Sequence, residues 1–173
     1  MGCGKSSVGI RLAQVLQQSF LDTDEWIEKK QGTTISEIFA KQGEEAFREM
    51  ETQCLLELLQ ESEEGILSLG GGLPIREKNR QLLKQLGKTV YLKAKPETIY
   101  ERLKGDTTRP LLQTENPQEK IRQMIATREE VYMAAADIVI VVDGKKIEDI
   151  VQEIVKKISE IHTNLLDFDR DLL

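Results

Sequence analysis

The sequence feature that most constrains the fold is a glycine-rich stretch at residues 2–7, Gly-Cys-Gly-Lys-Ser-Ser, which leads into apolar residues at helical spacing. Glycines let the backbone curl so that successive N–H groups can point at phosphate oxygens, and the following helix N-terminus adds partial positive charge. Lys5 supplies a full positive charge and Ser6 a hydroxyl suited to Mg²⁺. The stretch predicts a phosphate-binding loop, and a helix that merely begins with a glycine-rich turn is the alternative.

These residues make up only the second half of the complete pattern for such a loop, G-x-x-x-x-G-K-[ST]. That pattern places another glycine and a strand ahead of the loop. We therefore expect Met1 to be an internal methionine and a strand to precede Gly2 in the working protein.

The composition is that of a folded domain and argues against several kinds of partner. The chain has 173 residues, of which 39% are hydrophobic and 31% charged, and these values are typical of one globular domain. A net charge of −6 argues against non-specific binding to nucleic acid, and no apolar run in the sequence approaches membrane-spanning length. Cys3 and Cys54 have no metal-ligand spacing, which indicates a reducing compartment. We expect a cytoplasmic protein.

Segments typical of strands alternate with segments typical of helices along the chain. Apolar residues recurring at threes and fours predict the helices, and short apolar runs predict the strands between them. This alternation predicts an α/β protein whose parallel sheet is covered by helices on both faces. The four predicted strands lie near Phe20, Ile66, Val90 and Ile138.

Polar and glycine residues follow two of these strands. Asp22 and Asp24 come after the first, where the carboxyl edge of a parallel sheet binds ligands; an Asp-rich turn with helix-capping aspartates is the alternative. The glycines at residues 70–72 come after the second. Consecutive glycines cost backbone entropy, so we expect a ligand or side chain to approach the backbone there, with a flexible turn as the alternative.

We assign residues 1–162 to a single domain and residues 163–173 to a C-terminal tail. Helices are expected at residues 34–43 and 44–59. Arg48 and Glu51 share a side of the second helix, where a surface ion pair is the alternative to a functional role.

Residues 105–117 have neither helical nor strand periodicity, and a loop of this length is typical of a functional lid.

The motifs of the chain occur together in one order. They are Gly-Cys-Gly-Lys-Ser at 2–6, Asp-Thr-Asp at 22–24, Phe-Arg-x-x-Glu at 47–51, Gly-Gly-Gly at 70–72, Arg-Pro-Leu-Leu at 109–112 and Arg-x-x-x-Tyr at 128–132. In this order the chain resembles shikimate kinase, a member of the nucleoside-monophosphate-kinase-like group of P-loop phosphotransferases, from Gly2 to about Ile158. The resemblance implies a three-layer P-loop kinase fold with a central parallel sheet in the strand order 2-3-1-4-5, of which this chain lacks the first strand, and substrate-binding helices at about residues 24–60.

The activity that the resemblance implies is transfer of the γ-phosphate of MgATP to the 3-hydroxyl of shikimate, a step in making aromatic amino acids. ATP would be the co-substrate and Mg²⁺ the cofactor. Shikimate and ATP would be the small-molecule partners of a monomer that binds neither nucleic acid nor membrane. Another small-molecule kinase of the same group, such as a gluconate or nucleotide kinase, and a truncated, non-catalytic binding protein are the alternatives.

The resemblance also implies roles for residues around the nucleotide. Ser6 would bind Mg²⁺ directly and Asp22 through water, while Arg109, on the lid, would close onto the transferring phosphate. Lys5 and the loop amides would hold the β- and γ-phosphates. The residues implied for nucleotide binding are Gly2, Cys3, Gly4, Lys5, Ser6, Ser7, Arg102 and Lys145.

For shikimate, the resemblance implies that Asp24 holds its hydroxyls and orients the attacking one or accepts its proton. Arg48 and Arg128 would grip the carboxylate, which suits the planar, always-charged guanidinium. Lys5, Asp24 and Arg109 would thus be the catalytic residues. The backbone N–H groups that would assist in binding the carboxylate belong to Gly70, Gly71 and Gly72.

Overall fold

The computed structural model describes residues 2–61, 64–104, 114 and 116–170, with side chains as far as Ile161. Arg109 and most of the predicted lid lie outside the described residues. In chain order the elements are α1 (Lys5–Leu16), β1 (Ser19–Asp22), α2 (Thr23–Gln31), α3 (Ile35–Glu61), β2 (Gly65–Ser68), the 3-10 helix η1 (Leu73–Ile75), α4 (Glu77–Leu86), β3 (Val90–Lys93), α5 (Pro96–Leu103), α6 (Pro117–Ala135), β4 (Ile138–Val141) and α7 (Ile147–Arg170).

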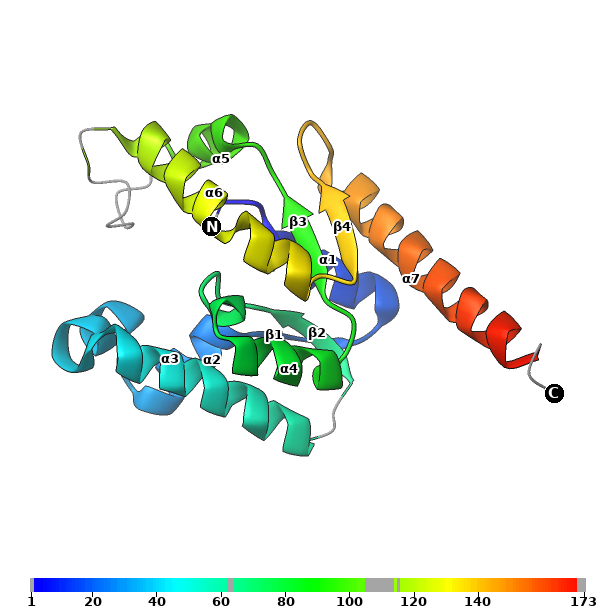
Figure 1. Cartoon of the computed structure of the whole chain (residues 1–173), viewed down its shortest axis with the longest axis horizontal. Helices are drawn as coiled ribbons and strands as arrows, with labels where there is room; N and C mark the ends of the chain where they lie inside the picture. Colours follow the sequence, from blue (N-terminus) through cyan, green and yellow to red (C-terminus); the bar gives the residue numbers. More distant parts are fainter. Residues whose placement is uncertain (1, 62–63, 105–113, 115, 171–173) are drawn as a thin grey trace.

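The strands form two parallel pairs (Figure 1). β1 pairs with β2, placing Phe20 opposite Ile66, and β3 pairs with β4, placing Tyr91 opposite Val139. The expected order 2-3-1-4-5 counts the strand expected ahead of Gly2 as strand 1, so β1 to β4 correspond to its strands 2 to 5. The observed pairs are therefore its pairs 2-3 and 4-5, and the predicted strands and their pairing are confirmed. Among the described residues, no strand lies between the two pairs.

A cavity of about 230 Å³ lies between the pairs. It is lined by β2 and β3, and not by β1 or β4, so the facing edges of the two pairs are those of β2 and β3. Apolar side chains such as Leu12 of α1, Leu86 of α4 and Ile154 of α7 close its sides. The cavity therefore occupies the position of a central strand in a continuous sheet.

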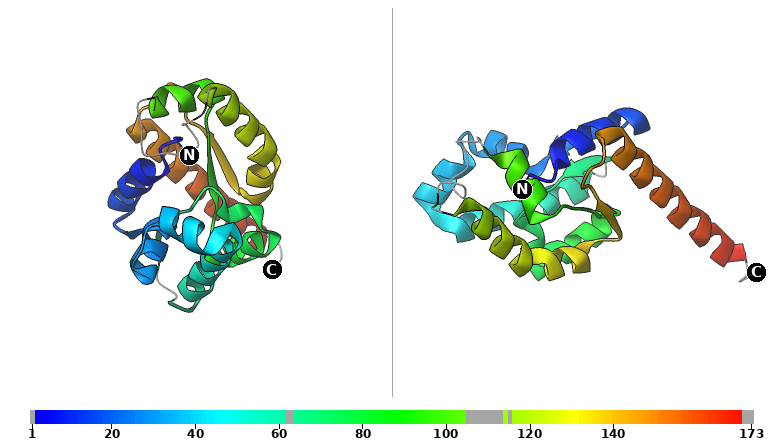
Figure 2. Two further views of the ribbon diagram at one scale, coloured as in Figure 1. Left: turned by 90° about the vertical axis from the view of Figure 1, so that its left-hand side faces the viewer. Right: turned by 90° about the horizontal axis from the view of Figure 1, so that it is seen from above.

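Helices cover both faces of the strands. Seen end-on, α1 and α7 lie on one side and α4 and α6 on the other, which gives three layers (Figure 2). The largest core cluster surrounds β3 and β4, where Ile140 and Val142 are 0% exposed and pack with Val8 of α1 and Ile154 of α7. Burying each such side chain contributes about 1.5–3 kcal/mol. Smaller clusters join α2 to α3 and α3 to α4.

The helix boundaries follow the predicted signals, with one difference at the end of the chain. A capping box starts α3: the N–H of Glu37 donates to the Thr34 hydroxyl, and the Glu37 carboxylate accepts from the N–H of Thr34, both at 3.3 Å. A kink at Gly43, whose dihedral angles are not helical, divides α3 into the two helices predicted on either side of it. At the other end of the chain, α7 runs to Arg170, so most of the predicted tail has helical backbone. None of the described helices combines the length and apolar character needed to cross a bilayer.

Candidate active site

The predicted phosphate-binding loop lies directly before α1. Gly2 and Gly4 have φ angles of 68° and 86°, in the left-handed region that favours glycine. At Gly2 an added Cβ would also lie 2.9 Å from Cδ1 of Leu103, so a larger residue there would both strain the backbone and displace the Leu103 side chain. The first turn of α1 holds no acidic residue, and Lys5 begins the helix. The positive helix end is therefore available to an anion.

The loop meets the end of β1 through Ser6 and Asp22. The Ser6 hydroxyl donates to Asp22 at 3.1 Å, and the other carboxylate oxygen of Asp22 accepts the N–H of Asp24 at 3.0 Å. Asp22 thus lies at the end of the strand and also caps α2, as the alternative of a helix-capping aspartate predicts. Ser6 and Asp22 supply oxygen ligands of the kind that Mg²⁺ binds together with phosphate and water. The described side chains form no cluster of three or more His, Cys, Asp or Glu that could hold a metal by themselves.

Asp24 lies in the first turn of α2, half-buried against the glycine turn at residues 70–72. A Cβ at Gly70 would overlap its carboxylate. Burial raises the pKa of Asp24, the negative charge of Asp22 raises it further, and Lys5 opposes the shift. A carboxylate with a raised pKa is a better proton acceptor than an ordinary aspartate.

Arg48 of α3 packs against the other end of the glycine turn. A Cβ at Gly72 would overlap its guanidinium. Arg48 donates to Glu51 and to Glu44, each at 2.8 Å. The Arg48 side chain is 13% exposed and that of Glu51 is 1% exposed, so the alternative of a surface ion pair between them is wrong. Burial raises the pKa of Glu51, an effect that the Arg48 guanidinium opposes.

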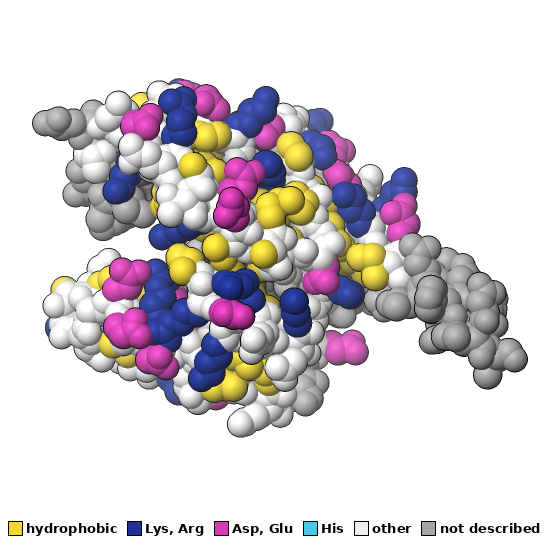
Figure 3. Space-filling view, in the orientation of Figure 1, with side chains coloured by type: hydrophobic (Ala, Val, Ile, Leu, Met, Phe, Trp, Pro, Cys, Tyr) yellow, Lys and Arg dark blue, Asp and Glu magenta, His cyan; other side chains and the backbone are white. Residues whose placement is uncertain are grey.

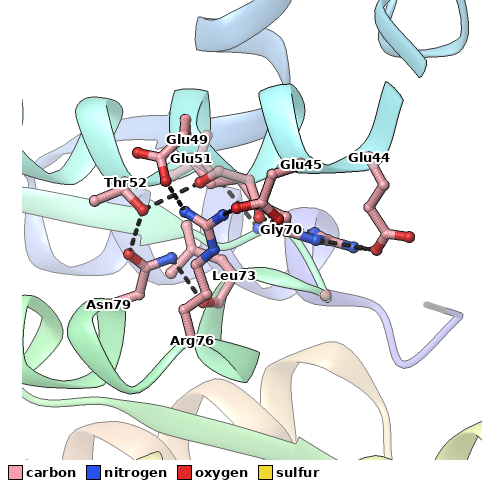
Figure 4. A network of polar contacts seen from close by, with 12 residues as sticks. Glu44, Glu45, Glu49, Glu51, Thr52, Gly70, Leu73, Arg76 and Asn79 are labelled. Atoms are coloured by element: carbon pink, nitrogen blue, oxygen red, sulfur yellow. Dashed lines mark hydrogen bonds and ion pairs between the residues drawn. The ribbon is translucent and has the colours of Figure 1, made fainter. Parts of the chain in front are cut away.

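A polar network ties α3 to the start of α4 beneath the glycine turn (Figure 4). Arg76, just before α4, pairs with Glu45 and, at 2.5 Å, with Glu49. The Thr52 hydroxyl lies 2.7 Å from the side-chain oxygen of Asn79, whose amide donates to the carbonyl of Leu73 at 2.9 Å. This network holds the helix that carries Arg48 against the segment that carries the glycines.

The glycine turn is anchored by two side chains that sequence reasoning missed. The Thr23 hydroxyl accepts the N–H of Gly70 at 2.9 Å, and the Tyr132 hydroxyl donates to the carbonyl of Gly71 at 2.6 Å. Both residues stand within the motifs quoted above, Asp-Thr-Asp and Arg-x-x-x-Tyr. Their position inside motifs of chemically active residues is the signal that could have singled them out.

The remaining predicted residues lie at several places around the loop and on α6, and not all of them reach the loop. Arg128 is half-buried on α6, one turn before Tyr132, and has no ion-pair partner among the described side chains. Arg102 reaches the loop, with its guanidinium 3.5 Å from the carbonyl of Gly2. Lys145 instead pairs with Glu153 of α7. The Cys3 side chain packs against the core, whereas Ser7 is exposed.

The surface is hollowed between the part formed by α5 and α6 and the part formed by α2 and α3 (Figure 3). Lys and Arg side chains gather at this hollow, while Asp and Glu side chains lie on the rim over α3. Positive charge in a recess favours anionic ligands even on a protein of negative net charge. The arrangement can therefore bind a phosphate group and a carboxylate close to a protein side chain that accepts a proton.

The sequence model of the shikimate kinase family matches residues 1–159. The chain belongs to the shikimate kinase family. A shikimate kinase of Francisella tularensis subsp. novicida (strain U112) is 40% identical over 154 residues, which span 89% of this chain and 88% of the relative.

Solved structures of shikimate kinases have the same fold. The enzyme from Acinetobacter baumannii in complex with shikimate has a TM-score of 0.83 at 41% identity, covering 92% of this chain and 89% of that one. The enzyme from Bacteroides thetaiotaomicron also has a TM-score of 0.83, at 32% identity, covering 92% of this chain and 94% of that one. The predicted family and its P-loop kinase fold are confirmed.

Proposed function

We propose that this chain transfers the γ-phosphate of ATP to the 3-hydroxyl of shikimate, in the pathway to chorismate and the aromatic amino acids. One observation carries the proposal: the glycine turn has the Arg48 guanidinium at one end and the Asp24 carboxylate at the other. A carboxylate-binding group and a proton acceptor are thereby separated by a short stretch of backbone. Shikimate carries a carboxylate and ring hydroxyls, which match this pair of groups.

Arg48 would bind the substrate carboxylate through the side of its guanidinium that faces Glu44. Both Nε and Nη2 of Arg48 donate to one oxygen of Glu44, at 3.2 and 2.8 Å, which is the edge that a carboxylate binds with two parallel hydrogen bonds. Glu44 is 65% exposed and could swing away, whereas the buried Glu51 would keep the guanidinium in place. Arg128, on α6, would supply the second charge.

Asp24 would orient the attacking hydroxyl and accept its proton. Phosphoryl transfer asks the protein mainly for positioning and charge stabilisation, which Lys5 and the loop amides would supply at the β- and γ-phosphates. Mg²⁺, when bound, would neutralise charge on those phosphates, and Ser6 and Asp22 would hold it, the second through water. Arg109, in the lid, would add positive charge at the transferring group.

We also propose a cytoplasmic, monomeric enzyme whose single domain spans residues 1–162. Support for the compartment comes from the cysteines, since Cys3 and Cys54 are both free thiols, as is usual where disulfides are reduced. Burial raises the pKa of Cys54 to about 12, which makes a redox or catalytic role for this thiol unfavourable.

An assay that couples ADP release to NADH oxidation tests the proposed function. We expect ADP release that depends on shikimate and on Mg²⁺, and no release with gluconate or nucleoside monophosphates. Lys5→Met is the matched control and should abolish turnover, because the phosphates lose their cation. Turnover with gluconate or a nucleotide in place of shikimate would support another small-molecule kinase, and shikimate binding without turnover would support a binding protein.

A further inference from the structure

We infer that Tyr132 is a positioning residue for the substrate carboxylate: by holding the carbonyl of Gly71, its hydroxyl orients the N–H of Gly72 as a hydrogen-bond donor beside Arg48. The inference rests on the proposed function, because it adds a residue to the same site. Tyr132 lies on α6, far along the chain from the glycines, and its hydroxyl lies 2.6 Å from the Gly71 oxygen.

The backbone groups of the glycine turn divide into those that are paired and those that are not. The Gly70 N–H donates to Thr23, and the carbonyls of Gly70 and Gly72 accept N–H groups of Leu73 and Ile75, at 3.1 and 3.0 Å. Tyr132 satisfies the carbonyl of Gly71. Among the described residues, the N–H groups of Gly71 and Gly72 have no hydrogen-bond partner. Backbone donors rarely stay unpaired away from water, so these two are available to a ligand.

The bond to Tyr132 fixes the direction of one of these donors. The described chain has no cis peptide bond, and in a trans peptide the C=O of one residue and the N–H of the next point in opposite directions. Because the Gly71 carbonyl points at Tyr132, the Gly72 N–H points away from Tyr132. Gly72 is also the residue whose Cα packs against the Arg48 guanidinium. An oxyanion bound to Arg48 therefore has a second donor next to it.

Tyr132 is itself held in place. Its ring packs on that of Tyr91 in β3, with 5.3 Å between centroids and an interplanar angle of 48°. Arg128 precedes Tyr132 by one helical turn, so the two side chains leave α6 on the same side. The hydroxyl thus links the helix that carries Arg128 to the turn that adjoins Arg48.

Tyr132→Phe tests the inference, because it removes the hydroxyl and keeps the ring. We expect the KM for shikimate to rise about three- to tenfold, the effect of one misdirected hydrogen bond, with kcat and the KM for ATP within about twofold of wild type. Tyr91→Phe is the matched control, since it alters the same ring pair without touching the Gly71 carbonyl, and should leave all three constants unchanged.

Urea unfolding of the same variants shows whether a rise in the KM for shikimate comes from a misdirected hydrogen-bond donor or from a loss of stability. A shikimate KM in Tyr132→Phe equal to that of wild type overturns the inference, and so does a parallel rise in both KM values. Wild-type turnover reports on the proposed function, and the ratio of variant to wild-type KM reports on Tyr132. If wild type binds but does not turn over shikimate, the ratio of dissociation constants replaces that of KM; a wild type that does not bind shikimate overturns both proposals.

Discussion

Arg48 shows how burial decides between two roles that its spacing leaves open. Its separation from Glu51 fits a surface ion pair on any helix, and such a pair contributes only a few tenths of a kcal/mol. In the structure both side chains are largely buried, with the guanidinium against Gly72. Removing charges from water is costly unless they are well paired, which favours a functional reason for the arrangement.

Replacing Arg48 by Lys should weaken shikimate binding without affecting the nucleotide. Lys keeps the charge but loses the planar guanidinium that can bind a carboxylate through two bonds. We expect the KM for shikimate to rise about 10- to 100-fold while the dissociation constant of MgADP stays unchanged. Arg122→Lys, at an exposed ion pair on α6, is the matched control. An unchanged shikimate KM in Arg48→Lys would remove this residue from the substrate site.

Asp24 should give the enzyme a pH dependence that an ordinary aspartate would not. Only the ionised carboxylate accepts a proton, and burial raises its pKa above 3.8. The rate should therefore fall as the pH is lowered through that raised pKa, in a range where an exposed aspartate stays ionised. Profiles of kcat/KM against pH measure this fall.

The matched variants are Asp24→Asn and Glu25→Gln, the latter at the exposed neighbour. We expect Asp24→Asn to lower kcat by about 10²- to 10⁴-fold and Glu25→Gln to change nothing. Because a raised pKa means that ionisation of Asp24 destabilises the fold as pH rises, Asp24→Asn should not unfold more easily at neutral pH. A profile with its acidic limb at the pKa of a free aspartate would contradict this role.

At the scale of elements, the path of α3 depends on the glycine at its kink. Gly43 has φ 82° and ψ 174° within the helix, a combination that essentially only glycine adopts. This break in the helix separates the helical segment that begins at the Thr34 capping box from the segment that carries Arg48. Phe39 and Phe47 pack across the break, with ring centroids 4.9 Å apart.

Asparagine substitutions at two glycines test this requirement. Gly43→Asn should lower the free energy of unfolding by about 1–3 kcal/mol. Gly32→Asn should cost less than about 1 kcal/mol, because Gly32 ends α2 in the left-handed conformation that asparagine tolerates. Neither added Cβ would meet another atom within 4 Å, so urea unfolding compares backbone conformation alone. Equal losses at the two positions would show that the break in α3 is not what requires Gly43.

The elements and their local signals were predictable, and the contacts between distant elements were not. The Thr34 capping box and the strand near Ile138 depend on residues adjacent in sequence. The bonds from Thr23 to Gly70 and from Tyr132 to Gly71 join different elements. Spacing along one helix or strand carries no information on which side chain of another element it will meet.

For the whole molecule, the alternation of elements predicted a parallel sheet covered by helices on both faces, and the resemblance implied which strands are neighbours. The cavity between β2 and β3 lies where the expected order places a central strand. The end of β1 and the glycine turn after β2 converge because parallel strands bring their carboxyl ends to one edge. The depth at which Glu51 and Asn79 are buried follows from the packing of α3 on α4, which no local pattern specifies.

Turnover of shikimate compared with that of its methyl ester, measured by ADP release, tests the central claim most directly. The ester keeps every hydroxyl and replaces the negative charge that Arg48 and Arg128 are proposed to bind by a neutral methyl ester. We predict that shikimate is phosphorylated and that kcat/KM for the ester is lower by about a hundredfold or more. Equal kcat/KM values for acid and ester, or no turnover of shikimate, would contradict the account.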